Sequence, residues 1–202
     1  MRRLICGIDE AGRGPLAGPV CAAAVILPDG FDLTILDDSK KLTYARREHA
    51  RKLICSAALA WGVGWASHEE IDRINILQAS LLAMKRAFES MLETELFKTN
   101  ASGGGQQFAI EAIIDGLFKP DISCSCRTMI RADAQISEVM AASILAKTAR
   151  DGEMERYSRL YPEYGFDRHK GYPTKAHRAA IMKYGPSPIQ RMSFTVKPVG
   201  GE

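Results

Sequence analysis

The sequence predicts an α/β protein in which helices pack on a mixed β-sheet. Two short apolar stretches, residues 2–8 and 20–27, are joined by a glycine-rich link, a pattern typical of an antiparallel hairpin. Further on, apolar stretches alternate with segments of helical periodicity, as in a sheet flanked by helices. With 202 residues, 46% of them hydrophobic, the chain suits one domain over 1–202, with about 161–202 as a C-terminal extension.

The first half of the chain supplies three predicted strands and two predicted helices. The strands at 2–8 and 20–27 are short and apolar, so we expect them to be buried. Thr43 is a candidate N-cap for a helix that ends at Ala57. Residues 61–67 alternate as a third strand does, and a capping box at 67–70 indicates a helix start. The long helix itself is expected from about 76 to 96.

The second half alternates strands with helices. Residues 98–106 contain three consecutive glycines and are expected to form a flexible surface loop. Strands are predicted at 108–114 and 127–132, and a long helix follows at 136–160. Residues 161–174 are expected to form a loop, and residues 175–184 a short helix.

Composition narrows the classes of function. A net charge of +3 permits nucleic acid as a partner without requiring it. The five cysteines lack zinc-site spacing, so we expect reduced thiols in a cytoplasmic protein. No stretch approaches the roughly 20 apolar residues that a membrane span needs, and the N-terminal apolar run is too short for a signal peptide. We expect a soluble monomer without a membrane partner.

Three acids each follow directly on a predicted strand, namely Asp9, Asp115 and Asp133. Strand ends hold side chains rigidly where the chain leaves the core, so functional groups gather there. Clustered carboxylates repel one another unless protons or cations neutralise them, and Mg²⁺ prefers such oxygen ligands. Taken singly, each of these acids also fits an ordinary cap or turn.

The adjacent pair Asp9-Glu10 is harder to explain as a cap. Neighbouring residues on a strand point to opposite faces, so one acid would enter the core unless the strand is interrupted. Gly12-Arg13-Gly14 makes an interruption easy, and its spacing is not that of a phosphate-binding P-loop. The segment fits a plain turn as well as a backbone that contacts a ligand and senses a 2′-hydroxyl group, with Arg13 on a phosphate.

Several basic residues are candidates for phosphate contacts. Lys40, Lys41 and Lys147 fit such a role, whereas Arg150 fits a solvated helix face better. Residues 156–183 mix basic and tyrosine side chains, which suits contacts to a duplex backbone and stacking. A packed subdomain with a basic exterior fits that composition equally well.

Five motifs carry a resemblance to a known family. In chain order they are GIDEAGRGPLAGPV (7–20), DDSKKLT (37–43), IDG (114–116), AASILAKTARD (141–151) and KGYPTKAH (170–177). On these motifs the sequence resembles the type 2 ribonucleases H, specifically the bacterial ribonuclease HII group. The resemblance implies a ribonuclease H-like mixed five-stranded sheet flanked by helices, with a helical C-terminal extension that binds substrate.

The resemblance also implies an activity. The family's enzymes hydrolyse the RNA strand of RNA–DNA hybrids and incise duplex DNA at embedded ribonucleotides, with Mn²⁺ or Mg²⁺. A two-metal-ion mechanism leaves 5′-phosphate and 3′-hydroxyl ends. Carried over by motif, Asp9, Glu10 and Asp115 would be catalytic metal ligands, and Asp133 would be the fourth acid of the cluster.

The same resemblance assigns residues to the substrate. Gly12, Arg13 and Gly14 would form the backbone that reads the ribose. Tyr172 would stack on the deoxyribose that follows the ribonucleotide and so select the RNA-to-DNA junction. Lys40 and Lys147 are expected to contact the substrate as well.

Two positions depart from the family pattern. Asp133 stands in Arg131-Ala132-Asp133-Ala134, where the family often has K-G-D-S, and Gln190 stands where the family often has histidine. Three other functions stay open at this point: a junction resolvase or integrase acting on DNA alone, a non-catalytic nucleic-acid binding module, and a structural metal protein. The last is the weakest, because the acids are too few to enclose an ion.

Overall fold

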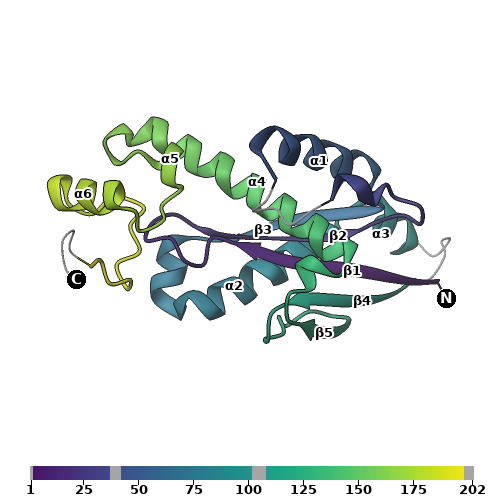
Figure 1. Ribbon diagram of the computed structural model, residues 1–202. Coiled ribbons are helices and arrows are strands. Elements are labelled where there is room, and N and C mark those ends of the chain that lie inside the picture. Colours follow the sequence, from purple (N-terminus) through teal and green to yellow (C-terminus); the bar gives the residue numbers. More distant parts are fainter. Residues whose placement is uncertain (1, 37–41, 102–107, 198–202) are drawn as a thin grey trace.

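A computed structural model of the chain describes residues 2–36, 42–101 and 108–197, with the side chains of 99–101 excepted. A five-stranded sheet forms the middle layer, and helices cover both of its faces (Figure 1). The C-terminal helices lie together beyond one end of the sheet, at the opposite end of the molecule from the N-terminus (Figure 1).

The sheet is mixed, with strand order β3-β2-β1-β4-β5. β1 (Arg2–Ala11) pairs antiparallel with β2 (Val20–Ile26) and parallel with β4 (Phe108–Asp115). β2 pairs antiparallel with β3 (Ala60–Ala66), and β4 pairs parallel with β5 (Ser125–Met129). The predicted mixed five-stranded sheet and its N-terminal hairpin are therefore confirmed.

Helices α1 (Tyr44–Ala57) and α4 (Ser137–Leu160) cover one face of the sheet, and α2 (His68–Leu92) covers the other (Figure 1). Thr43 caps α1 as predicted, because its side chain accepts a hydrogen bond from the Arg46 backbone N–H. The remaining elements are short: α3 (Glu95–Ala101), α5 (Phe166–His169), α6 (Lys175–Tyr184), and the 3₁₀ turns η1 (Leu33–Ile35), η2 (Ala132–Ala134) and η3 (Pro162–Tyr164).

Helix α2 begins earlier than predicted, because it consists of two helical segments that meet at Asn75. The capping box at Ser67 and Glu70 starts the first segment at His68. Asn75 then adopts a non-helical conformation with φ of 65°, and its side chain accepts hydrogen bonds from the backbone N–H groups of the next turn. The sequence signals at 67–70 and near 76 thus mark two separate helix starts.

Three other predicted segments differ from the structure. Residues 98–101 complete α3 instead of joining a loop, and residues 102–107 lie outside the described residues. The segment 161–174, expected to be a loop, contains η3 and α5. The strand predicted at 127–132 ends at Met129, because Arg131 turns the chain in a left-handed conformation with φ of 57°.

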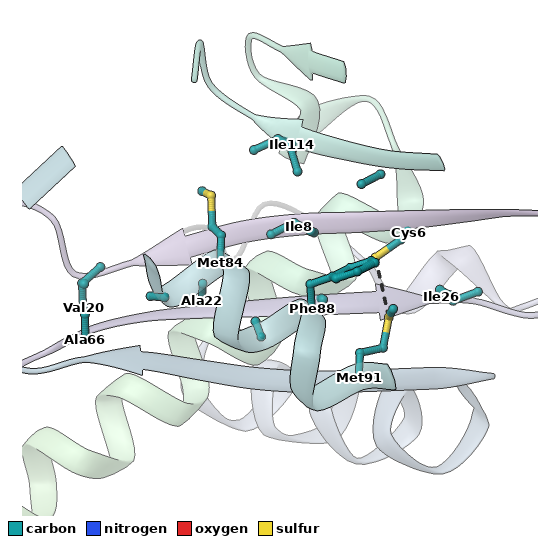
Figure 2. Close-up of a cluster of buried hydrophobic side chains, with 14 of the residues drawn as sticks. Cys6, Ile8, Val20, Ala22, Ile26, Ala66, Met84, Phe88, Met91 and Ile114 are labelled. Carbon is teal, nitrogen blue, oxygen red and sulfur yellow. Dashed lines mark hydrogen bonds between the residues drawn. The ribbon is translucent and has the colours of Figure 1, made fainter. Parts of the chain in front are cut away.

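The main hydrophobic core lies between the sheet and α2. Along β1, Cys6 and Ile8 are buried on this side, where Phe88 and Met91 of α2 pack against them (Figure 2). The Cys6 and Met91 sulfur atoms lie 3.6 Å apart. Because side chains alternate along a strand, residues of odd number in β1 face α4 instead. Asp9, near the end of β1, therefore lies on the face of the sheet that α4 covers.

All five cysteines are unpaired in the structure. Within the described part of the chain, none of the helices combines the length and the apolar character that crossing a bilayer requires.

Candidate active site

Three carboxylates from different parts of the chain meet at one edge of the sheet. Asp9 lies near the end of β1, Asp115 ends β4, and Asp133 lies in η2. One carboxylate oxygen from each lies within 4.8 Å of those of the other two. β1 and β4 are parallel, with Ile8 aligned to Ile114, so the next residue of each strand emerges at the same edge and on the same face.

The turn after β5 determines where Asp133 lies. The Ala132 backbone N–H donates a hydrogen bond of 2.8 Å to Asp115 Oδ1, and the Gly116 N–H donates one of 3.0 Å to the Met129 carbonyl oxygen. These bonds join the ends of β4 and β5. The expectation that Asp133 directly follows a strand was therefore wrong, since a 3₁₀ turn carries it. Its carboxylate nevertheless lies in the three-acid group.

Asp9 is buried, with only 7% of its surface exposed. Burial raises its pKa well above the ordinary value, and the negative charges of Glu10 and Asp115 raise it further. One interaction acts in the opposite direction, because the Glu10 backbone N–H donates a hydrogen bond of 2.7 Å to Asp9 Oδ1. The site thus concentrates more negative charge than its surroundings neutralise, which favours binding of a cation.

Glu10 lies beside the three-acid group without belonging to it. Burial raises the pKa of its carboxyl group, while the Arg13 guanidinium, 3.3 Å away, acts to lower that pKa. Its second oxygen, Oε2, is buried and has no hydrogen-bond partner among the described residues. A buried carboxylate oxygen without a donor is suited to a cation.

The acids line a cleft of about 310 Å³ together with the other predicted site residues. Lys147 is mostly buried there and contacts Asp151 at 2.7 Å, and burial lowers the pKa of its amino group. The cleft residues that sequence reasoning had singled out are Asp9, Glu10, Gly12, Arg13, Gly14, Asp115, Asp133, Lys147 and Tyr172. Lys40, also predicted to bind substrate, lies outside the described residues.

Sequence reasoning missed that two arginines at the cleft are buried, and one of them, Arg150, belongs to the cleft lining. Arg150 was expected on a solvated helix face, but only 1% of it is exposed. Its spacing could have revealed this, because it follows the buried Ala142 and Ala146 at intervals of four residues on α4. Arg191 is completely buried, and the local sequence around it gives no periodic signal.

Comparison with known sequences finds one family along nearly the whole chain. The family model described as Ribonuclease HII matches residues 6–197. The Ribonuclease HII of Treponema denticola is 56% identical over 197 residues, which are 96% of this chain and 99% of the relative. That of Geobacter sulfurreducens is 50% identical over 192 residues, or 95% of this chain and 82% of the relative.

Solved structures share the fold at lower identity. Ribonuclease H2 from Pyrococcus horikoshii matches with a TM-score of 0.69 and 24% identity, covering 96% of this chain and 94% of that one. The ribonuclease HII of Archaeoglobus fulgidus, solved with PCNA, matches with a TM-score of 0.70 and 23% identity, covering 97% of both chains. A ribonuclease HIII in complex with Mn²⁺ matches with a TM-score of 0.65 and 20% identity, covering 90% of this chain and 63% of that one. The predicted ribonuclease H-like fold is confirmed.

Proposed function

The chain belongs to the ribonuclease HII family, and from this premise we propose that it hydrolyses the RNA strand of RNA–DNA hybrids and incises duplex DNA at embedded ribonucleotides. It is a type 2 ribonuclease H, an endoribonuclease that depends on divalent metal ions. One observation supports the proposal best: three carboxylates lie within 4.8 Å of one another in the cleft that Gly12, Arg13 and Gly14 also line.

The residues of the cleft fit divalent cations. Asp9, Asp115 and Asp133 offer hard oxygen ligands, and the buried Oε2 of Glu10 lacks a hydrogen-bond donor. We infer that the three aspartates hold the ions and that Glu10 completes the set. When bound, two such ions supply an activated water and stabilise the departing 3′-oxygen, which leaves 5′-phosphate and 3′-hydroxyl ends. Either Mg²⁺ or Mn²⁺ matches this all-oxygen donor set.

The glycine-rich segment beside the acids would select the ribose. Gly12 adopts φ of 101°, a conformation that favours glycine, and a Cβ atom there would collide with the Arg150 side chain, so glycine is required beside the acids. Main-chain groups at Gly12 and Gly14 could then contact a 2′-hydroxyl group, while the half-exposed Arg13 contacts a phosphate. Tyr172 is 42% exposed and lies next to Gly14, where its ring is placed to stack on the adjoining sugar.

The substrate duplex would extend from the cleft over the C-terminal part of the chain. Arg168 and Lys175 are exposed there and flank Tyr172 in the sequence. Their charges suit contacts to phosphates that position a duplex without reading its sequence. Lys147, which lines the cleft, would contact a phosphate there, and Lys40 is proposed as a further contact.

We further propose a monomeric, cytoplasmic enzyme. One copy of the chain brings the three carboxylates together and places Gly12, Arg13 and Gly14 beside them, as a monomeric enzyme requires. Five free cysteines suit a reducing compartment.

The test is cleavage of three labelled duplexes: DNA with one embedded ribonucleotide, a uniform RNA–DNA hybrid, and all-DNA. Each is incubated with Mg²⁺, with Mn²⁺ and with a chelator. We expect cleavage of the first two only when a metal is present, with 3′-hydroxyl ends on the products. Cleavage of all-DNA would favour a junction nuclease instead, and binding without turnover would favour a non-catalytic module.

A further inference from the structure

Two buried arginines lie behind the glycine-rich segment, which we call the ribose loop (residues 12–19). Arg150 comes from α4, and Arg191 comes from the segment after α6. Only 1% of Arg150 and 0% of Arg191 are exposed. In the part of the chain that the structure describes, their hydrogen bonds go to backbone carbonyl oxygens and none to a carboxylate.

Arg191 holds the two ends of the ribose loop together. Its guanidinium donates hydrogen bonds to the carbonyl oxygens of Gly12 at 2.6 Å and Arg13 at 3.0 Å. It also donates to those of Gly18 at 2.8 Å and Pro19 at 3.2 Å. These four bonds direct carbonyl groups from both ends of the loop toward one buried guanidinium.

Arg150 joins the ribose loop to the segment that carries Tyr172, which we call the tyrosine loop (residues 170–174). It donates to the carbonyl oxygens of Pro19 at 2.9 Å and Ala17 at 3.2 Å in the first loop. It donates to the Lys170 carbonyl oxygen, at 3.0 Å, in the second. A backbone hydrogen bond of 2.8 Å from Leu16 to Gly171 links the same two loops.

Burying two like charges side by side is costly. Burial, together with the neighbouring charge of Arg150, lowers the pKa of Arg191 to about 9. A planar guanidinium with five fixed donors is the one side chain that can satisfy several carbonyl groups of an irregular loop at once. The arrangement thus keeps two loops in one geometry at the expense of stability.

We propose that Arg150 and Arg191 are positioning residues, which fix the distance between the ribose loop and Tyr172 and thereby determine the preference for an RNA–DNA junction. This inference rests on the proposed function, in which the two loops read adjoining nucleotides. A ribose and the following deoxyribose are recognised together only while the two loops keep one spacing. A uniform RNA strand needs no such spacing, so looser loops affect its cleavage less.

The contact between the loops leaves no room for adjustment. Gly171 has φ of 84°, and a Cβ atom there would lie 2.6 Å from the Ala17 carbonyl oxygen. The two backbones therefore touch directly. A change of either loop is transmitted to the other, and the buried guanidinium of Arg150 fixes both from behind.

The experiment compares Arg150→Lys with the wild type on two duplexes, one with a single embedded ribonucleotide and one a uniform RNA–DNA hybrid. Lysine keeps the charge but cannot hold three carbonyl groups in fixed directions. We define the ratio as kcat/KM on the single-ribonucleotide duplex divided by kcat/KM on the uniform hybrid. This ratio should fall about tenfold or more in the variant, since small misplacements of positioning groups have effects of this size. Arg86→Lys is the matched control, because Arg86 binds Glu70 and the Trp65 carbonyl oxygen outside the cleft and should leave the ratio unchanged.

An unchanged ratio in folded Arg150→Lys would overturn the proposal, since a purely structural role lowers both constants together. Gly171→Ala is a second variant that separates the loops without removing a charge, and it should lower the ratio too. If Arg150→Lys does not fold, the ratio measured for Gly171→Ala decides whether the proposal holds. Binding of both duplexes is also measured by fluorescence anisotropy without metal. Should the wild type cleave neither duplex, the proposed function fails, and the ratio of binding constants then tests the positioning role.

Discussion

Replacing Asp9 with asparagine keeps the size of a buried side chain and removes one charge from the three-acid group. In the metal-free protein this change should stabilise the fold, because Asp9 lies within 4.8 Å of two other carboxylates. Two unit charges at that distance repel by about 3.5 kcal/mol when the effective dielectric constant is about 20. Protonation already relieves part of this repulsion, since burial and the neighbouring acids raise the pKa of Asp9.

We therefore expect Asp9→Asn to increase the free energy of unfolding by about 1–3 kcal/mol. For a chain of this size, each kcal/mol raises Tm by about 2–4 °C. The pH dependence has a definite sign. A carboxyl group whose pKa is raised in the folded state costs stability as the pH rises through that pKa. The advantage of the variant should thus be present at neutral pH and vanish under acidic conditions, where Asp9 of the wild type is protonated.

The assay is thermal unfolding with and without Mn²⁺, together with cleavage of the single-ribonucleotide duplex. The wild type should gain stability when Mn²⁺ is added, and Asp9→Asn should gain less and lose cleavage while it still binds the duplex. Asp121→Asn is the control, because Asp121 is 94% exposed, pairs with Lys85, and should change stability by less than about 1 kcal/mol. A metal-free Asp9→Asn protein less stable than the wild type, or one that cleaves at the wild-type rate, would refute the reasoning.

The other predictions concern the walls of the cleft and the histidine behind the tyrosine loop. Gly12→Ala should lower the free energy of unfolding by about 2 kcal/mol or more and reduce cleavage, because the new Cβ atom would collide with the buried Arg150 side chain. Gly30 is the control: it has a similar positive φ but open space around it, so Gly30→Ala should lower the free energy of unfolding less. Lys147→Met should weaken duplex binding and reduce its salt dependence, measured by anisotropy, and unchanged salt dependence would exclude a phosphate contact by Lys147. Burial lowers the pKa of His177 to about 4. Because the unfolded chain then binds a proton more readily than the folded one, the wild type should lose up to about 3 kcal/mol of stability as the pH falls from 6.5 to 4. His177→Phe has no group that titrates at this position, so it should lose less stability over the same pH range.

Local patterns predicted the elements that depend on neighbouring residues. The apolar runs at 2–8 and 108–114 predicted that Asp9 and Asp115 follow strands. The structure places Asp115 at the end of β4 and Asp9 within β1, two residues before its end, and the Thr43 cap correctly placed α1. Such features arise within a few residues, so they are visible in the chain itself. Resemblance to a family added Tyr172, whose neighbours in the sequence are ordinary loop residues.

The amino-acid order alone was enough to indicate a mixed sheet, a set of acids at its edge and a glycine-rich segment beside them. It held no local sign that Arg191 is buried, and although the spacing of Arg150 fits a buried position, it did not show what satisfies either arginine. The partners lie 131 to 179 residues away along the chain for most of their hydrogen bonds. Nor did it show the turn that brings Asp133 to Asp115, which depends on a hydrogen bond between β4 and the segment after β5. Burial of a charge is decided by which distant backbone groups satisfy it, and only the folded chain brings those groups together.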